Sequence, residues 1–276
     1  MKRSVSIAFA LLFAVESWGQ EAAIPDKNLA TALRKYVFGL KEGQPLTAEM
    51  VGSVIYVNVT KDTPVSNLAG LDKAKNLVTV FIDGSPVADL TPLRNLSKLQ
   101  ALTVRGGKIK DLSALAGLTG LTYLDLAGNE ITDLKPLANL KNLDALHLSN
   151  NKIADISPLA GLEALQTLHL DGNQIGDVKP LAALKNLSAL DLKKNQIRDV
   201  SPLAALTTLR YLYLDQNQVS DVSPLVTMAA KDDQGPKKFA PYWTISLEGD
   251  PLNASAKTKE LPELRKHALD VVISDK

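Results

Sequence analysis

The sequence predicts an α/β solenoid, in which short strands stack into one parallel sheet on the concave side and compact turns close the convex side. From Leu77 onward, a unit of 22 residues recurs seven times without insertion or deletion. Every unit opens on a leucine, at positions 77, 99, 121, 143, 165, 187 and 209. A third observation is that further apolar residues recur at positions 4, 6, 11, 14, 17 and 20 of the unit. A fixed period of this length indicates a solenoid.

Each repeat has a strand half and a turn half. The unit LTYLDLAGNEITDLKPLANLKN starts at Leu121, and its apolar positions 4 and 6 have the period of two that is typical of a strand. Strands of successive units should stack in parallel, about 4.8 Å apart. Pro136 lacks an amide donor, so the convex segment should be a short 3₁₀ or irregular turn. The spacing L-x-x-L-x-L-x-x-N-x-I thus predicts a leucine-rich-repeat horseshoe.

Two polar positions recur within the unit. Position 9 is asparagine in the last five units, and its amide can satisfy backbone groups where the chain leaves the strand. We expect these side chains to form a ladder, with looser turns where Ser85 and Gly107 replace it. Position 13 is aspartate in all seven units, which suggests either a calcium ladder or caps for the turns that follow. With one carboxylate per unit and no glycine-rich calcium motif, capping is favoured.

The first residues have the features of a secretory signal peptide, which we place at 1–19. Lys2 and Arg3 precede an apolar run, and Ser17 and Gly19 supply small residues at the third and first positions before a cleavage in front of Gln20. The run is shorter than the roughly 20 residues that a membrane-spanning helix needs. We therefore expect an exported protein without a membrane anchor, either secreted or periplasmic.

Residues 20–53 are predicted to form an N-terminal helical cap that hides the end of the core. Within residues 25–40, one helical face is apolar, and Asp26 and Gly39 are placed to begin and end this helix. Thr47 is placed to cap a second short helix. The members of the apolar face are Leu29, Leu33, Tyr36 and Val37.

The repeats are predicted to occupy residues 54–230 and to begin with a degenerate turn that contains Val54, Val57 and Val59. Residues 231–276 should hold an insertion, a last strand and a C-terminal cap. In this segment, Ile245 and Leu247 restart a strand, and Asp250 stands where the ladder asparagine would be. We expect Leu261, Leu264 and Leu269 to belong to the closing element.

Composition excludes several classes of function. The chain has no cysteine, which rules out disulfides and thiol catalysis. Of 31 basic and 30 acidic residues, removal of Lys2, Arg3 and Glu16 with the signal peptide leaves 29 of each. A net charge near zero argues against nucleic acid or an anionic membrane surface as the partner. No nucleophile elbow, zinc-protease motif or phosphate loop is present, so the sequence indicates a protein that is not an enzyme and needs no cofactor.

The repeat unit L-x-x-L-x-L-x-x-N-x-I-x-D-h-x-P-L, the opening IPDKNLATALRKYVFGL and the closing GDPLN…ELPELRKHALDVV resemble internalin-like bacterial leucine-rich-repeat proteins. The resemblance covers nearly all of the chain after the signal peptide. It implies an exported protein that binds other proteins on a curved sheet. The wall anchors and additional modules of the better-known members are missing here, so a role in host-cell invasion is not implied.

The open concave face should carry the ligand site, because its outward side chains at positions 3, 5 and 7 are free to bind. The residues chosen as ligand contacts are Phe81, Tyr123, Asp125, His147, His169, Asp191, Lys193, Tyr211, Tyr213 and Asp215. Exposed aromatic residues carry most weight among them, with Tyr211 and Tyr213 at the centre. The alternative is that these scattered rings have no binding role and only cover the sheet.

His147 and His169 take the same position in adjacent units, between Asp125 and Asp191. Such a row suggests a metal site, a pH-responsive ligand contact or a solvated polar row. Parallel side chains do not converge as a tetrahedral zinc site requires, so no metal is predicted. The expected partner is a protein. Glycan binding is the alternative, because Tyr123, Tyr211, Tyr213 and Trp243 are rings on which sugars stack.

Overall fold

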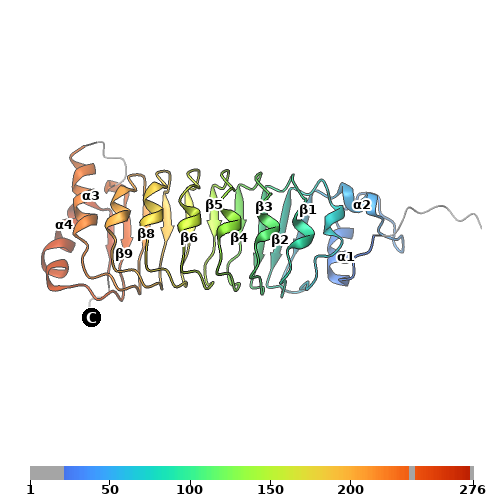
Figure 1. Cartoon of the computed structure of the whole chain (residues 1–276), viewed down its shortest axis with the longest axis horizontal. Coiled ribbons are helices and arrows are strands. Elements are labelled where there is room, and N and C mark those ends of the chain that lie inside the picture. Colours follow the sequence, from blue (N-terminus) through green and yellow to red (C-terminus); the bar gives the residue numbers. More distant parts are fainter. Residues whose placement is uncertain (1–21, 236–239, 274–276) are drawn as a thin grey trace, which may run out of the picture.

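The computed structural model describes residues 22–235 and 240–273 and shows an elongated solenoid built on one parallel sheet (Figure 1). Within these residues, ten strands follow one another in the sheet in chain order. They are β1 (Tyr56–Val59), β2 (Thr79–Asp83), β3 (Ala101–Arg105), β4 (Tyr123–Asp125), β5 (Ala145–His147), β6 (Thr167–His169), β7 (Ala189–Asp191), β8 (Tyr211–Tyr213), β9 (Thr244–Ser246) and β10 (Asp270–Val272). The predicted solenoid is thus confirmed. The proposed signal peptide lies outside the described residues.

The convex side consists mainly of short 3₁₀ helices, as the prolines predict. They span Leu71–Lys73, Thr91–Leu93, Ser113–Leu115, Lys135–Leu137, Ser157–Leu159, Lys179–Ala183 and Ser201–Ala205. The next turn differs, because α3 (Ser223–Asp233) is an α-helix of 11 residues where a short turn was predicted. Extra residues precede β9, so this turn need not close within 22 residues, and Pro224 near its start is compatible with a helix.

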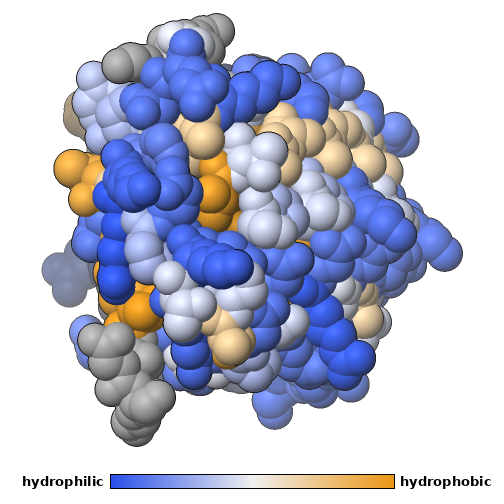
Figure 2. All heavy atoms as spheres, turned by 90° about the vertical axis from the view of Figure 1, so that its left-hand side faces the viewer, coloured by the Kyte–Doolittle hydropathy of each residue, from blue (hydrophilic) through white to orange (hydrophobic). Residues whose placement is uncertain are grey.

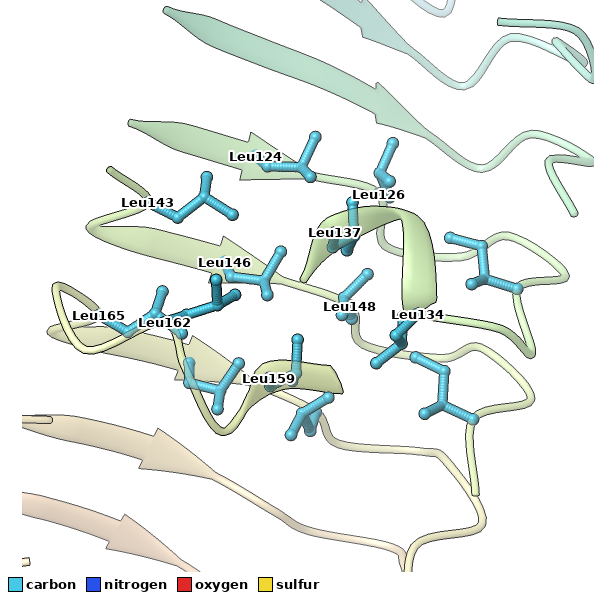
Figure 3. Packing of buried hydrophobic residues seen from close by; sticks show 14 of the residues in the cluster. Leu124, Leu126, Leu134, Leu137, Leu143, Leu146, Leu148, Leu159, Leu162 and Leu165 are labelled. Carbon is cyan, nitrogen blue, oxygen red and sulfur yellow. The ribbon is translucent and has the colours of Figure 1, made fainter. Parts of the chain in front are cut away.

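The core lies between the sheet and the convex turns. Figure 3 shows leucines from the strands, such as Leu124 and Leu146, facing leucines from the turns, such as Leu137 and Leu159. All four are fully buried. Burial of one such side chain contributes about 1.5–3 kcal/mol, and each repeat supplies several. Stacking of neighbouring units thus stabilises a fold in which no single unit has a core of its own.

The asparagine ladder is present and satisfies the backbone where the chain leaves the strands. Asn173 is typical: its Oδ1 accepts the Ile153 amide at 3.0 Å, and its Nδ2 donates to the carbonyls of Leu148 and Leu170 at 3.0 and 2.9 Å. Asn129, Asn151, Asn195 and Asn217 repeat this arrangement. Each one links its own unit to the preceding unit, so the ladder connects successive repeats along the length of the solenoid.

The turns at Ser85 and Gly107 are not loose, and that expectation was wrong. Ser85 is buried, and its hydroxyl accepts the Val65 amide at 3.1 Å, which is the role of the asparagine oxygen elsewhere. At Gly107, a Cβ would lie 2.6 Å from the Val87 carbonyl oxygen. Glycine therefore allows a close approach of two backbones here.

The aspartates at position 13 cap the convex turns, as predicted. Asp155, for example, accepts the Ser157 amide at 2.8 Å, and the other six make the same contact two residues ahead. The carboxylate thereby satisfies the first free amide of each turn. This contact accounts for the recurrence of aspartate without calcium.

The N-terminal cap contains α1 (Lys27–Arg34) and α2 (Ala48–Ser53). Asp26 caps α1 by accepting the amides of Asn28 and Leu29, and Thr47 caps α2 by accepting that of Met50, as predicted. Asp26 also accepts the Ser66 amide at 2.8 Å, which ties the cap to the first turn. The helix ends at Arg34, so Gly39 does not end it; Gly39 instead adopts a φ of 74° in a later turn.

The C-terminal cap is more elaborate than the sequence predicted. A π-helical turn (Ala256–Glu260) leads into α4 (Leu261–His267), whose Leu261 and Leu264 are buried as expected. Leu269 also lies in this closing segment, but it is exposed just before β10, an additional strand at the edge of the sheet. Figure 2 faces this end of the solenoid and shows a mainly hydrophilic surface with small apolar patches.

Candidate ligand-binding face

One row of side chains runs along the sheet at position 5 of the repeats. The register pairs Asp125 with His147, His147 with His169, and His169 with Asp191. The row is extended by Phe81 and Thr103 on one side and by Tyr213 and Ser246 on the other. The predicted Asp-His-His-Asp row is therefore real, and it lies on the face of the sheet opposite the core.

Asp125 is the centre of the first polar cluster on this face. Its Oδ2 accepts from Nε and Nη2 of Arg105 at 2.7 and 2.5 Å and from the Tyr123 hydroxyl at 3.4 Å. Its Oδ1 accepts the Ala127 amide at 3.1 Å. Asp125 was expected to be open to a ligand, but only 1% of it is exposed, because Arg105 and Tyr123 cover it. It can act on a ligand only through these neighbours.

The two histidines stack on each other beside this cluster. Their ring centroids are 4.4 Å apart, and Tyr123 lies 5.4 Å from the His147 ring. The Nδ1 of His147 is 3.6 Å from Asp125 Oδ2. Burial lowers the pKa of His147, and repulsion from His169 and Arg105 lowers it further, whereas Asp125 and Asp171 oppose that shift. His147 is therefore held in its neutral form at neutral pH.

A second cluster joins Asp191, Lys193 and Tyr213. The Nζ of Lys193 is 3.1 Å from Asp191 Oδ2 and lies 4.9 Å from the centroid of the Tyr213 ring. Burial raises the pKa of the Asp191 carboxyl, although hydrogen bonds from Lys193 counteract this effect. The ion pair and the cation–π contact fix the Tyr213 ring in place.

Tyr211 and Asp215 lie at the C-terminal part of the face. Tyr211 is 47% exposed, whereas Asp215, also expected to be an open contact, is buried. Asp215 accepts the Glu248 amide at 2.9 Å and a hydrogen bond from the Ser246 hydroxyl. Its carboxylate thus holds β9 against β8 and leaves Tyr211 as the prominent ring of the two strands.

Trp243 does not belong to the face. It was included among rings on which a sugar could stack, but it is fully buried. It directly precedes β9, and its carbonyl accepts the Asp270 amide at 3.2 Å. Phe81, in contrast, lies half-buried in the position-5 row, as predicted.

Arg105 and Ser246 are functional candidates that the sequence did not single out. A usable signal existed for Arg105, because position 7 of one unit lies diagonally opposite position 5 of the next, 20 residues later in the chain. For Ser246 there was no such signal, since the insertion before β9 breaks the period.

In the described part of the chain, no group of three or more histidine, cysteine or acidic side chains is arranged to hold a metal ion. The rings of His147 and His169 pack against each other at an interplanar angle of 40°.

These features define a leucine-rich-repeat solenoid with a polar and aromatic concave face. A family model for leucine-rich repeats in two copies matches residues 119–161, 141–183, 163–205 and 185–227. Internalin C2 from Listeria monocytogenes is 38% identical, with a TM-score of 0.69, and the alignment covers 74% of this chain and 90% of that one. The chain therefore belongs to the internalin-like bacterial leucine-rich-repeat proteins.

Other solved structures share the fold. The internalin InlF from Listeria monocytogenes is 29% identical with a TM-score of 0.80, and the alignment covers 95% of this chain and 75% of that one. A leucine-rich-repeat protein from Leptospira interrogans is 18% identical with a TM-score of 0.63, covering 76% and 57% of the two chains. No curated protein sequence matches the chain. Among residues 22–235 and 240–273, no helix is long and apolar enough to cross a bilayer.

Proposed function

We propose that this protein is exported and that it binds a protein partner on the concave face without catalysing a reaction. The observation that carries the proposal is the pair of tyrosines on β8. Tyr211 is 47% exposed, and Tyr213 lies beside it, held by Lys193. Tyrosine is enriched in the hot spots of protein interfaces. The internalin family of the chain supports the same function.

The rest of the face supports the proposal through its rigidity. Arg105, Tyr123 and Asp125 hold one another by hydrogen bonds, and Asp191 and Lys193 form an ion pair. Side chains that are already ordered lose little conformational entropy when a partner binds. The cluster of Asp191 and Lys193, next to β8, would thus form a polar rim beside the tyrosines, whereas the cluster of Asp125 lies four strands away and would extend the contact surface.

Glycan binding is the weaker alternative. Of the four rings first considered for stacking, Trp243 is buried, and the Tyr123 ring contacts His147 while its hydroxyl donates to Asp125. Of the remaining two, Tyr211 is well exposed, and Tyr213 is half-buried with Lys193 Nζ over its ring. One well exposed ring beside a half-buried, charge-covered ring favours a protein hot spot over a sugar platform.

Export is proposed from residues 1–19, in which Lys2 and Arg3 precede an apolar run and the small residues Ser17 and Gly19 precede Gln20. In the native host, the exported protein should begin near Gln20 when its N-terminus is sequenced. An intact Met1 in the exported fraction would contradict this part of the proposal.

Affinity capture from the native surroundings tests the proposed partner class. Residues 20–276 are immobilised and exposed to an extract that has been divided into untreated, protease-treated and glycosidase-treated portions, with a glycan array run in parallel. We expect capture of a protein that protease abolishes and glycosidase does not, together with a blank array. Capture that survives protease, with binding on the array, would favour a glycan ligand. A bait carrying Tyr211→Ala and Tyr213→Ala controls for specificity.

A further inference from the structure

Asp250 occupies the last position of the asparagine ladder, in the turn after β9. Its Oδ1 accepts the Val219 amide at 2.9 Å. One unit earlier, Oδ1 of Asn217 accepts the Ile197 amide at 3.0 Å in the same way. Asp250 therefore reproduces the acceptor half of the ladder and joins the C-terminal cap to the seventh repeat.

The donor half of the ladder is missing if this carboxyl is ionised. The Nδ2 of Asn217 donates to the carbonyls of Leu192 and Leu214, one in the preceding unit and one in its own. The corresponding atom of Asp250, Oδ2, is buried and has no hydrogen-bond partner within the described residues. An ionised carboxylate would leave charge on an unpaired buried oxygen, which is costly. A protonated carboxyl has an O–H group that donates, as an amide does.

One charged side chain, Asp215 in the turn after β8, repels the charge of Asp250. Two further acidic residues belong to the C-terminal region: Glu248 lies in the same turn as Asp250, and Glu260 accepts the Val222 amide at the start of α3. Hydrogen bonds from the amides of Val219 and Asn217 lower the pKa of Asp250. Burial is the largest effect, and together with the repulsion from Asp215 it raises this pKa to about 7.

We propose that Asp250 is a proton-operated latch: the carboxylic acid completes the ladder and holds the C-terminal cap closed, and loss of its proton loosens the junction between β8 and β9. The proton passes to water, and no other group is needed. The junction carries Tyr213, Asp215 and Ser246, so the latch also controls the order of one end of the candidate binding face.

The sign of the pH dependence follows from proton linkage. An aspartate in the opened cap has the ordinary pKa of 3.8, so between about 4 and about 7 the closed cap binds a proton that the open cap releases. The equilibrium constant for opening should therefore rise with pH through that window, by up to about tenfold per pH unit, and level off above it.

A carboxyl titration tests the latch directly. Residues 20–276 are labelled with carbon-13 aspartate, and the carboxyl resonance absent from the spectrum of Asp250→Asn is assigned to Asp250. We expect a titration midpoint near 7. A midpoint at the ordinary aspartate value of about 4 would overturn the proposal.

Hydrogen exchange tests the consequence for the cap. Exchange in residues 214–222 and 244–252 is followed against pH and corrected for the intrinsic rate of exchange. In the wild type, opening should increase up to about pH 7, whereas Asp250→Asn should remove this dependence and keep the cap closed. Asp62→Asn, which changes an exposed carboxylate in another turn, should behave as the wild type. An unchanged pH dependence in Asp250→Asn would contradict the latch.

Discussion

Arg105 and Asp125, which are 20 residues apart in the chain, form a two-nitrogen contact on adjacent strands, with Nε and Nη2 at 2.7 and 2.5 Å from Oδ2. Asp125 is nearly fully buried, whereas the Arg105 side chain is 40% exposed. The arginine therefore covers a carboxylate that would otherwise lie as a bare charge on the open face of the sheet. Its loss would affect both the stability and the charge of the face.

Arg105→Ala should lower the free energy of unfolding by about 1–3 kcal/mol, because it leaves buried Asp125 without its main donor. The remaining donors, Ala127 and Tyr123, limit the loss. Urea unfolding of the variant measures this effect. Arg198→Ala is the matched control, since Arg198 donates to Gln218 on the exposed side of the solenoid. Equal midpoints for the two variants would mean that the pair adds no stability.

Asn173→Ala should destabilise the solenoid more than Asn95→Ala. The first change leaves the buried Ile153 amide without its acceptor. It also removes one of the two amide donors from each of the buried carbonyls of Leu148 and Leu170, which still accept from Asn151 and Asn195. An unsatisfied buried group costs about 1–3 kcal/mol. Asn95 is exposed on the convex side. Denaturant melts of both variants decide between a structural ladder and an incidental one.

His147 should make the fold less stable in mild acid. Because burial and His169 lower the pKa of His147 in the folded state, the unfolded chain binds the proton first as pH falls below the ordinary value of 6.5. Stability contributed by neutral His147 is thus present above pH 6.5 and declines below it.

The comparison for this prediction is His147→Gln, measured by urea unfolding at a series of pH values. The wild type should lose stability relative to the variant as pH falls from 7.5 to about 5. A constant difference across this range would show that the stacked pair does not restrict protonation.

The repeating part of the fold could be predicted from sequence because one unit determines all its neighbours. Leu124 and Asn129 have equivalents 22 residues later, so their burial and their contacts follow from the period. The C-terminal end could not be predicted in this way. The insertion interrupts the period there. The formation of α3 and β10 and the burial of Trp243 therefore depend on packing that has no equivalent in the repeats.

The sequence predicted where the side chains of the candidate site lie on the sheet, but not how far each one is exposed. The row from Asp125 to Asp191 follows from the register alone. Whether a side chain on this face is open depends on the size and charge of its neighbours in the sheet. Arg105 covers Asp125, whereas the side chains directly beside Tyr211, Ala189 and Thr244, are too small to cover it.

The proposed binding of a partner to the concave face around β8 is tested most directly by the affinity of a captured partner for two double variants. Tyr211→Ala with Tyr213→Ala should weaken binding by about 2 kcal/mol or more, roughly 30-fold in Kd, with nearly unchanged thermal stability. Lys135→Ala with Lys179→Ala, on the exposed convex turns, should leave Kd nearly unchanged. Loss of binding in the convex pair, with full binding in the tyrosine pair, would contradict the account.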